Sequence, residues 1–509
     1  MGLDELRRIA EGVTFKGASN VSALAASFVT SIFLTRHFGR ESYGLLILTY
    51  SVTSFLLNFS DFGVKRTLQR YIPRYLSMGE QEKAGAMMQS ALLLQVAGIL
   101  MVTGLLFMLR STIAVQVFGK PALYPLLLTG VFYLGSFALF DFCLQFYQSL
   151  QRWPMEGALN FLHPLLYLLL LLGIVYGVYD GVAAALIANG MAGLTVVAVG
   201  ALLLPPEVRC LLLRRPRWEW LLTQTRVTLS FGGPLVFSAF VFVVSGWLDK
   251  ALLGKYRPLD EVTDYYIAAS FIAGMMLLFK TLNVVLSPYV AEISTGEEGL
   301  IRARFHTVFR WVLQAALLSG IAMYVIAEPL ILFLYGGSFG PAVMAFRLLL
   351  AVYVARAVTT ATGLFAVNAY GLVKRHALLT AVLITVNILL NIVLIPGHGL
   401  FGAAAAAIGA YVAYHGAFLI IMPEVRRLIP VATVVRTAVA VAGTTAVAIL
   451  LARAGVTHPV LTGSALLGTY LTMLGLSGEV RKGDVETARH LMGSVLAMVR
   501  RLVRVCAAG

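Results

Sequence analysis

The sequence predicts an all-α polytopic membrane protein with about fourteen transmembrane helices. Hydrophobic residues occupy 59% of the 509 positions, and charged residues occupy only 12%. Soluble domains carry about 25% charged residues, so a water-soluble fold could not cover this much apolar surface. The apolar residues lie in stretches of roughly 20, the length that a helix needs to cross a bilayer, and the connections between them are short. These observations exclude soluble, fibrous and disordered proteins.

The apolar stretches fall into two groups of six followed by a final pair. They begin near Lys16, Ser42, Lys83, Pro121, Gly157 and Gly181, then near Arg226, Thr263, Arg304, Pro341, Leu372 and Phe401, and finally near Val431 and Pro459. We therefore expect an N-terminal lobe over residues 1–205, a basic cytoplasmic linker over 206–225 and a C-terminal lobe over 226–425, followed by two further helices over 426–478 and a cytoplasmic amphipathic tail over 479–509.

The distribution of basic residues predicts the orientation. Most of the 39 Lys and Arg residues fall in the N-terminal segment, in alternate loops and in the tail. Loops rich in Lys and Arg stay in the cytoplasm, so both termini are expected there, in a multi-pass protein of the cytoplasmic (inner) membrane. The same rule accounts for the net charge of +15 without a nucleic-acid partner.

The two groups of six resemble one another. Similar segments recur in the same order in both, namely residues 71–75 and 287–290, 117–119 and 334–336, and 180–185 and 400–405. An even number of spans in each group means that both groups enter the membrane from the same side. The expected arrangement is therefore a parallel pseudo-two-fold repeat, which is typical of transporters.

Cations inside the apolar stretches are the strongest candidates for a binding site. A Lys or Arg at mid-bilayer costs about 2.5–3.5 kcal/mol on insertion scales, so a chain retains one for a partner or a ligand. Lys280 and Arg356 lie well inside their stretches, while Arg347 lies nearer an outer end and Lys16 begins the first stretch. Amides at helical spacing extend this set of expected substrate-binding residues to Asn283, Asn387, Asn391 and Gln145. For the amides, hydrogen bonds that only hold the bundle together are an open alternative.

Four further charged residues are candidates for gating or ion-pair contacts: Asp61, Asp141, Asp249 and Lys250. Asp141 is the mid-span carboxylate, and an open alternative is that it pairs with Lys280 or Arg356 as a buried structural ion pair. Asp249 lies next to Lys250 at an outer end, where we expect a contact that closes the lobes. The acidic cluster Asp260, Glu261 and Asp264 is expected to be a solvated loop.

Three segments resemble the polysaccharide and O-antigen flippases of the MOP superfamily, which also contains the MATE drug exporters. They are the residues from Phe38 to Gly44, the residues Asp61-Phe62-Gly63 with Arg70 further on, and the residues from Ile395 to Ala404. The likeness runs from about Phe15 to Met422. It implies fourteen spans, two six-helix lobes and a central cavity that opens alternately to each side of the membrane. It also implies a cargo in which an oligosaccharide is carried on a polyprenyl diphosphate.

The expected function is therefore a flippase that moves this cargo from the cytoplasmic to the outer leaflet through a cationic cavity. The expected partners are the lipid-linked oligosaccharide and membrane lipids, with H+ or Na+ as candidate coupling ions, and the chain is expected to be a monomer. No nucleotide-binding motif and no metal-binding cysteine spacing occurs, so no catalytic residue, metal or cofactor is expected. The alternatives are a cation-coupled MATE-type drug exporter and a membrane glycosyltransferase or polymerase acting on polyprenyl-linked sugars.

Overall fold

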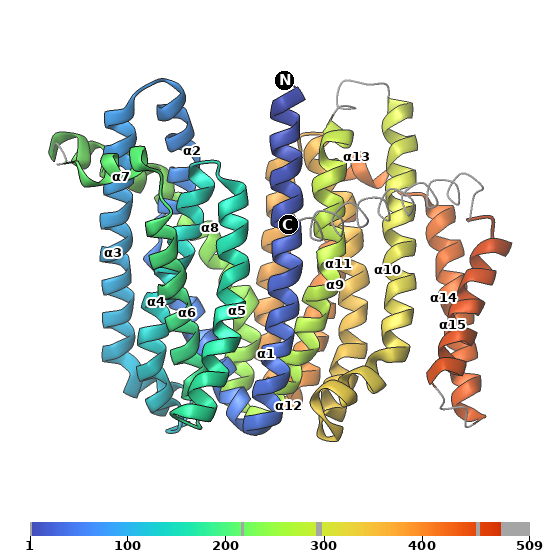
Figure 1. Cartoon of the computed structure of the whole chain (residues 1–509). Coiled ribbons are helices and arrows are strands. Elements are labelled where there is room, and N and C mark those ends of the chain that lie inside the picture. The colour runs from blue at the N-terminus through green and yellow to red at the C-terminus, as the bar shows by residue number, and fades with distance from the viewer. Residues whose placement is uncertain (1–2, 215–217, 292–297, 455–458, 480–509) are drawn as a thin grey trace, which may run out of the picture. The chain divides into compact units, whose positions relative to one another are not determined.

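The computed structural model describes residues 3–214, 218–291, 298–454 and 459–479, and these ranges contain helices and turns but no strand (Figure 1). The long helices are α1 (Leu3–Leu57), α3 (Gln81–Ser111), α4 (Leu123–Ser149), α5 (Trp153–Gly177), α6 (Ala183–Leu202), α8 (Trp218–Tyr256), α9 (Leu259–Ala291), α10 (Glu298–Tyr335), α11 (Gly340–Asn368), α12 (Val373–Ile421), α14 (Val431–Arg453) and α15 (Pro459–Leu476). Three shorter helices are α2 (Val64–Ser77), α7 (Pro206–Leu213) and α13 (Pro423–Arg426). The all-helical prediction is confirmed for these residues.

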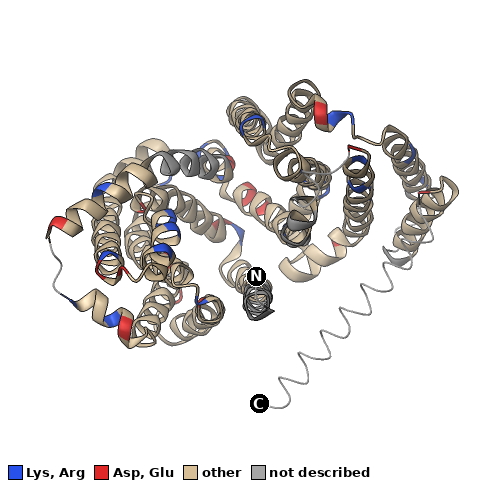
Figure 2. Cartoon of the chain, turned by 90° about the horizontal axis from the view of Figure 1, so that it is seen from above, with Lys and Arg blue, Asp and Glu red and all other residues tan. Residues whose placement is uncertain are grey.

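Among the described residues, nine helices are long and apolar enough to cross a membrane. Each stretch that the sequence led us to expect as a span is helical, but the count of fourteen spans stays a prediction. Figure 2, which views the chain from above, shows how sparse the charged residues are among the helices. The expected amphipathic tail lies outside the described residues except for Glu479.

Two of the helices are much longer than a bilayer is thick. The helix α12 contains 49 residues, which would extend about 74 Å if it were straight, against about 30 Å for the hydrocarbon core. It is interrupted at Gly399 (φ 56°), and α1 is interrupted at Gly39 (φ 81°). A left-handed backbone costs glycine little, so both breaks fall where the sequence permits them. Each break lies between two expected spans, and we therefore expect α1 and α12 to cross the membrane twice.

The chain forms two compact units. Unit 1 consists of residues 1–277, 331–349 and 378–417, and unit 2 consists of residues 278–330, 350–377 and 418–509. In unit 1, α4 packs against α3 and α6, while α1 packs against α5 and α8. In unit 2, α14 packs against α15. The expected lobe boundaries and the parallel repeat stay predictions.

The helix α2, which follows α1, is amphipathic, and its apolar face is buried. Its residues Val64, Leu68 and Ile72 are spaced by four and are fully buried in a cluster with Met87 and Met88 of α3. The arginines at positions 66, 70 and 74 have the same spacing on the other side of the helix and are exposed. Residues four apart share one helical face, so burial of the apolar stripe fixes the orientation of α2.

Close approach of helices in unit 1 depends on glycine. A Cβ added at Gly63 would lie 2.1 Å from the Cα of Gly232, and one added at Gly44 would lie 2.2 Å from the carbonyl oxygen of Leu259. Neither distance is possible for a real side chain. Small residues at helix contacts are the usual means by which membrane helices pack at short range.

Candidate functional site

A cavity of about 330 Å³ lies in unit 1 between α1, α8 and α9. The lining residues are Leu24, Ser27, Phe28 and Ser31 of α1, Trp247 and Lys250 of α8, and Tyr266, Ala269, Ser270 and Ala273 of α9. The α1 residues follow the spacing of one helical face, as do those of α9. We call this space the α1/α8/α9 cavity.

Lys250 is the charged residue that lines the α1/α8/α9 cavity, and it is only 8% exposed. Its Nζ donates hydrogen bonds to the carbonyl oxygen of Gly246 (2.7 Å) and to Oδ1 of Asp249 (3.0 Å). The same Oδ1 accepts the Lys250 backbone N–H at 2.8 Å. The Nζ also lies 5.2 Å from the centre of the Trp247 ring. Asp249 and Lys250 thus form an ion pair, while their expected role in closing the lobes stays a proposal.

Hydroxyl groups supply most of the remaining polarity of this cavity. Ser27 and Ser270 donate to the backbone oxygens of Ala23 and Ile267, both at 2.8 Å. Ser31 shares a hydrogen bond of 2.8 Å with the hydroxyl of Tyr335. The serines, Trp247 and Tyr266 were not among the site residues predicted from the sequence. Their signal is a pair of polar residues four apart on each of two apolar helices, which a search for charges and amides overlooks.

The two central predicted cations, Lys280 of α9 and Arg356 of α11, both belong to unit 2. Lys280 is exposed and Arg356 is half-buried. The helices that carry them pack together, because the rings of Phe279 and Tyr353 lie 5.5 Å apart and Asn368 Nδ2 donates to Ser287 Oγ at 2.9 Å. Among the described residues of unit 2, neither cation has a carboxylate within ion-pair distance. Their role in binding stays a prediction.

Asp141 has a different partner from those we expected. Its carboxylate forms an ion pair with Lys65, at the start of α2. The cause is the packing of α2 against α4, which places Lys65 across from Asp141. The alternative in which it pairs with Lys280 or Arg356, which belong to unit 2, stays a prediction. Asp61 Oδ1 accepts the backbone N–H of Lys65 at 3.1 Å, so both carboxylates lie near the first turn of α2.

The predicted amide Gln145 belongs to a polar network between helices of unit 1. Gln69 Nε2 donates to Gln145 Oε1 at 2.7 Å and to Gln148 Oε1 at 2.9 Å. Gln148 Nε2 in turn donates to Glu156 Oε1 at 2.9 Å. The network joins α2, α4 and α5, so it contributes interhelical hydrogen bonds of the kind that hold a membrane bundle together.

The other predicted site residues are placed as follows. Asn391 is buried, and its Nδ2 donates to Asn387 Oδ1 at 3.1 Å, one turn earlier on α12. Asn283 and Arg347 are half-buried on α9 and α11. Lys16 lies on α1, but its side chain is outside the described residues. The structure brings Asn387 and Asn391 together, and the site that all of these residues would form stays a proposal.

A second polar cluster of unit 1 corrects another expectation. Asp264 is only 1% exposed and pairs with Arg40, whose backbone oxygen accepts a hydrogen bond from Thr263 (2.7 Å). Glu261 pairs with Arg257 at 2.9 Å and accepts the backbone N–H of Leu400 at 3.0 Å. The expectation that these acids form a solvated loop is therefore wrong for Asp264. The helical start of α9 turns it inward, where the Arg40 guanidinium compensates its charge.

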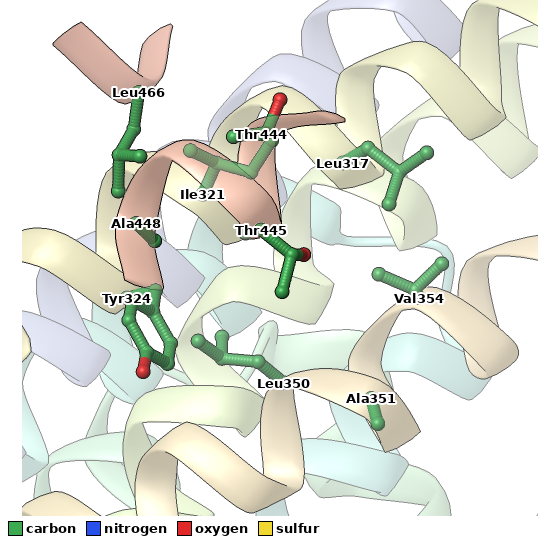
Figure 3. A pocket seen from close by; sticks show the side chains of 11 residues that line it. Leu317, Ile321, Tyr324, Leu350, Ala351, Val354, Thr444, Thr445, Ala448 and Leu466 are labelled. Carbon is green, nitrogen blue, oxygen red and sulfur yellow. The ribbon is translucent and has the colours of Figure 1, made fainter. Parts of the chain in front are cut away.

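A largely apolar pocket of about 300 Å³ lies within unit 2 (Figure 3). It is lined by Leu317, Gly320, Ile321 and Tyr324 of α10, Leu350, Ala351 and Val354 of α11, Thr444, Thr445 and Ala448 of α14, and Leu466 of α15. The hydroxyls of Thr444 and Thr445 donate to the backbone oxygens of Ala440 and Val441 at 2.8 Å. Because these donors are already satisfied, the pocket presents an apolar surface.

Comparisons with known proteins agree with this fold. Residues 9–294 match the family described as "Polysaccharide biosynthesis protein". A segment of 164 residues is 29% identical to the probable flippase AglR of Haloferax volcanii and covers 32% of this chain and 34% of that protein. The matched part therefore spans about a third of the relative's length.

Two solved structures are similar to most of the chain. The lipid II flippase MurJ, in an inward closed conformation, has a TM-score of 0.68 at 11% identity, over 90% of this chain and 97% of that one. A multidrug resistance MATE transporter of the MOP superfamily, in an inward-facing conformation, has a TM-score of 0.64 at 15% identity, over 81% of this chain and 95% of that one. At such identities these likenesses establish the fold.

Proposed function

The chain belongs to the polysaccharide biosynthesis protein family, and from this membership we propose that it is a flippase. Its cargo in this proposal is an oligosaccharide linked to a polyprenyl diphosphate, moved from the cytoplasmic to the outer leaflet. We further propose fourteen spans in two parallel six-helix lobes with a C-terminal pair, a location in the inner membrane, and both termini in the cytoplasm. The relative AglR bears the name of a probable flippase, which supports the proposal.

The observation that carries the proposal is the pair of cations on α9 and α11. Within the described part of unit 2, neither Lys280 nor Arg356 has a carboxylate as an ion-pair partner. At about 2.5–3.5 kcal/mol each, two such residues would cost about 5–7 kcal/mol at mid-bilayer, which a purely structural role does not repay. A diphosphate is an anionic ligand that Arg and Lys bind well, with Arg presenting a planar fork to its oxygens. The cargo's charge would therefore compensate theirs.

The remaining predicted residues have subordinate roles in this proposal. Arg347 and Lys16 form a second tier of positive charge, and Asn283, Asn387, Asn391 and Gln145 offer amides to the sugar hydroxyls. The lobes rock between inward-open and outward-open states around the bound cargo. The binding must remain moderate, because a site that is too tight in either state would trap the cargo.

The apolar pocket of unit 2 suits the other end of the cargo. It lies between α10, α11, α14 and α15 and offers aliphatic side chains together with the Tyr324 ring (Figure 3). A prenyl chain carries no hydrogen-bonding group of its own, so burying it in this apolar pocket would leave none of its atoms without a hydrogen-bond partner. We propose that part of the polyprenyl tail occupies this pocket during transport.

A MATE-type drug exporter remains the second candidate, because solved MATE transporters share the fold. The carboxylates Asp61 and Asp141, which outnumber the single Lys65 beside them, are the observation that favours it. The glycosyltransferase alternative would need available acids. In the cluster near the start of α9, Asp264 and Glu261 are occupied by Arg40 and Arg257.

Reconstitution tests the proposal directly. Purified protein in sealed vesicles should carry a fluorescent polyprenyl-diphosphate oligosaccharide across the bilayer, measured by its protection from a membrane-impermeant quencher. Lys280→Ala should slow the flipping by about tenfold, the loss expected for one charged hydrogen bond. Lys374→Ala removes the same charge from an exposed position of α12 and should have no effect. Transport of a cationic dye without any flipping would favour the exporter and refute the flippase.

A further inference from the structure

We infer that the α1/α8/α9 cavity binds one pyranose ring of the cargo's glycan and does not bind its diphosphate. The inference rests on the proposed function, because it assumes that the cargo carries sugar. It assigns a recognition role to Trp247, Lys250, Tyr266 and the serines of α1 and α9. None of these residues belongs to the substrate-binding set proposed above, in which Lys280 and Arg356 are central.

Electrostatics decides against the diphosphate as occupant. Of the residues that line the cavity, Lys250 alone carries a charge. Its Nζ lies 3.0 Å from the Asp249 carboxylate, and the two side chains are 10% and 14% exposed. This neighbourhood therefore has no net charge with which to compensate a multiply charged anion. Desolvating a diphosphate against a neutralised lysine would be unfavourable, whereas a neutral ring brings no charge to compensate.

The hydrogen-bonding groups match a polyhydroxyl ligand. The Lys250 ammonium has three donors, of which Gly246 and Asp249 use two, so one is left for a ligand. The hydroxyls of Ser27, Ser31 and Ser270 donate to or share bonds with protein oxygens, and each oxygen retains capacity to accept.

Trp247 and Tyr266 each add one polar group to the lining of the cavity. Neither the Trp247 indole N–H nor the Tyr266 hydroxyl has a hydrogen-bond partner among the described residues. A sugar hydroxyl both donates and accepts, so it can bond to each kind of group. A purely apolar occupant such as a prenyl chain would leave these groups unsatisfied, which is costly inside a membrane protein.

The size and the rings of the cavity favour a single sugar. Its volume of about 330 Å³ lies at the small end of the roughly 300–1,000 Å³ found for ligand pockets. The Trp247 ring offers a large, rigid apolar face with one polar edge, and Phe28 and Tyr266 add further aromatic surface. A pyranose presents an apolar C–H face and a rim of hydroxyls, so it complements this combination of aromatic face and scattered polar groups.

Saturation-transfer NMR on the purified full-length protein tests the inference. The probes are methyl pyranosides of glucose, galactose and N-acetylglucosamine, with inorganic pyrophosphate as a competitor. We expect at least one pyranoside to bind the wild type and to resist displacement by pyrophosphate. Trp247→Leu should weaken that binding by about tenfold, as loss of an aromatic contact and a donor predicts. Trp218→Leu makes the same change at a side chain that is 72% exposed, and it should bind like the wild type.

A second variant keeps the test valid if Trp247→Leu does not fold. Tyr266→Phe removes only a hydroxyl that has no partner among the described residues, and its binding should fall by about fivefold. The inference is overturned if the wild type binds no pyranoside, if pyrophosphate displaces the bound pyranoside, or if a folded variant binds as the wild type does. Flipping measured on the same preparation separates the two claims. A wild type that flips its cargo but binds no pyranoside overturns this inference alone, and a wild type that flips nothing overturns the proposed function.

Discussion

Alanine at position 63 should destabilise the protein through two separable effects. Gly63 has φ +78°, which an L-residue adopts at a cost of about 1–2 kcal/mol. Its added Cβ would lie 2.1 Å from the Cα of Gly232, so the α8 backbone would have to shift, at a cost of about 1–3 kcal/mol. The two effects together amount to about 2–5 kcal/mol of unfolding free energy.

Alanine substitutions at other glycines separate the energetic cost of the backbone conformation from the cost of the close contact. Gly79 has φ +73° but no atom within 4 Å of an added Cβ, so Gly79→Ala should incur only the conformational cost. On α8, an alanine Cβ at Gly232 would lie 2.6 Å from Gly63, whereas one at the adjacent Gly233 would meet nothing within 4 Å. Gly233→Ala should therefore be neutral or stabilising, because alanine favours helix by up to about 1 kcal/mol over glycine.

The assay is reversible unfolding of purified protein in mixed micelles, followed by circular dichroism. Gly63→Ala should be less stable than Gly79→Ala by about 1–3 kcal/mol, and Gly232→Ala should be less stable than Gly233→Ala. The reasoning is refuted if the two members of each pair are equally stable, because the contact between α8 and the turn before α2 would then contribute nothing.

Two further predictions concern ion pairs, and a third concerns the orientation in the membrane. Lys65→Met leaves Asp141 without its partner and should lower the free energy of unfolding in micelles by about 1–3 kcal/mol, less than for a fully buried pair, because the two side chains are 23% and 26% exposed. Adding Asp141→Leu should restore much of the stability, and the absence of any rescue would contradict the pairing. Arg40→Ala should lower the free energy of unfolding by about 3–5 kcal/mol, because it leaves the Asp264 carboxylate, only 1% exposed, without its partner. The double variant Arg40→Asp with Asp264→Arg should recover part of this stability. A double variant no more stable than Arg40→Ala would contradict the contact. A reporter fused after position 509 should lie in the cytoplasm, and an external signal would contradict the proposed orientation.

The helices were predictable because membrane insertion imposes a length and a composition on each of them. The breaks at Gly39 and Gly399 fall between expected spans, where a left-handed glycine ends one helix and begins the next. The partner of Asp141 could not be predicted in this way. Lys65 stands on an amphipathic helix whose orientation is set by burial of Val64, Leu68 and Ile72, and this packing cannot be derived from periodicity within a single span.

The α1/α8/α9 cavity could not be predicted for a related reason. Its lining residues come from α1 and from the consecutive helices α8 and α9, which lie more than 150 residues further along the chain. Apart from Lys250, these helices contribute small, aliphatic or aromatic side chains of kinds that are common in membrane spans. Lys250 was identified as a charged residue, but its position in a cavity beside Trp247 depends on how α8 packs against α1. Sequence patterns indicate which face of a helix is polar, whereas the neighbour of that face is decided by the fold.

The most direct test of the central claim is the flipping rate of the charge-reversed variant Lys280→Glu with Arg356→Glu. We predict a loss of about a hundredfold or more in reconstituted vesicles, because two attractive contacts with the diphosphate become repulsive. The control Lys374→Glu with Arg427→Glu reverses two exposed charges and should flip the cargo at the wild-type rate. A double variant that reaches the membrane, folds, and still flips the lipid-linked oligosaccharide as fast as the control would contradict the cationic site on α9 and α11.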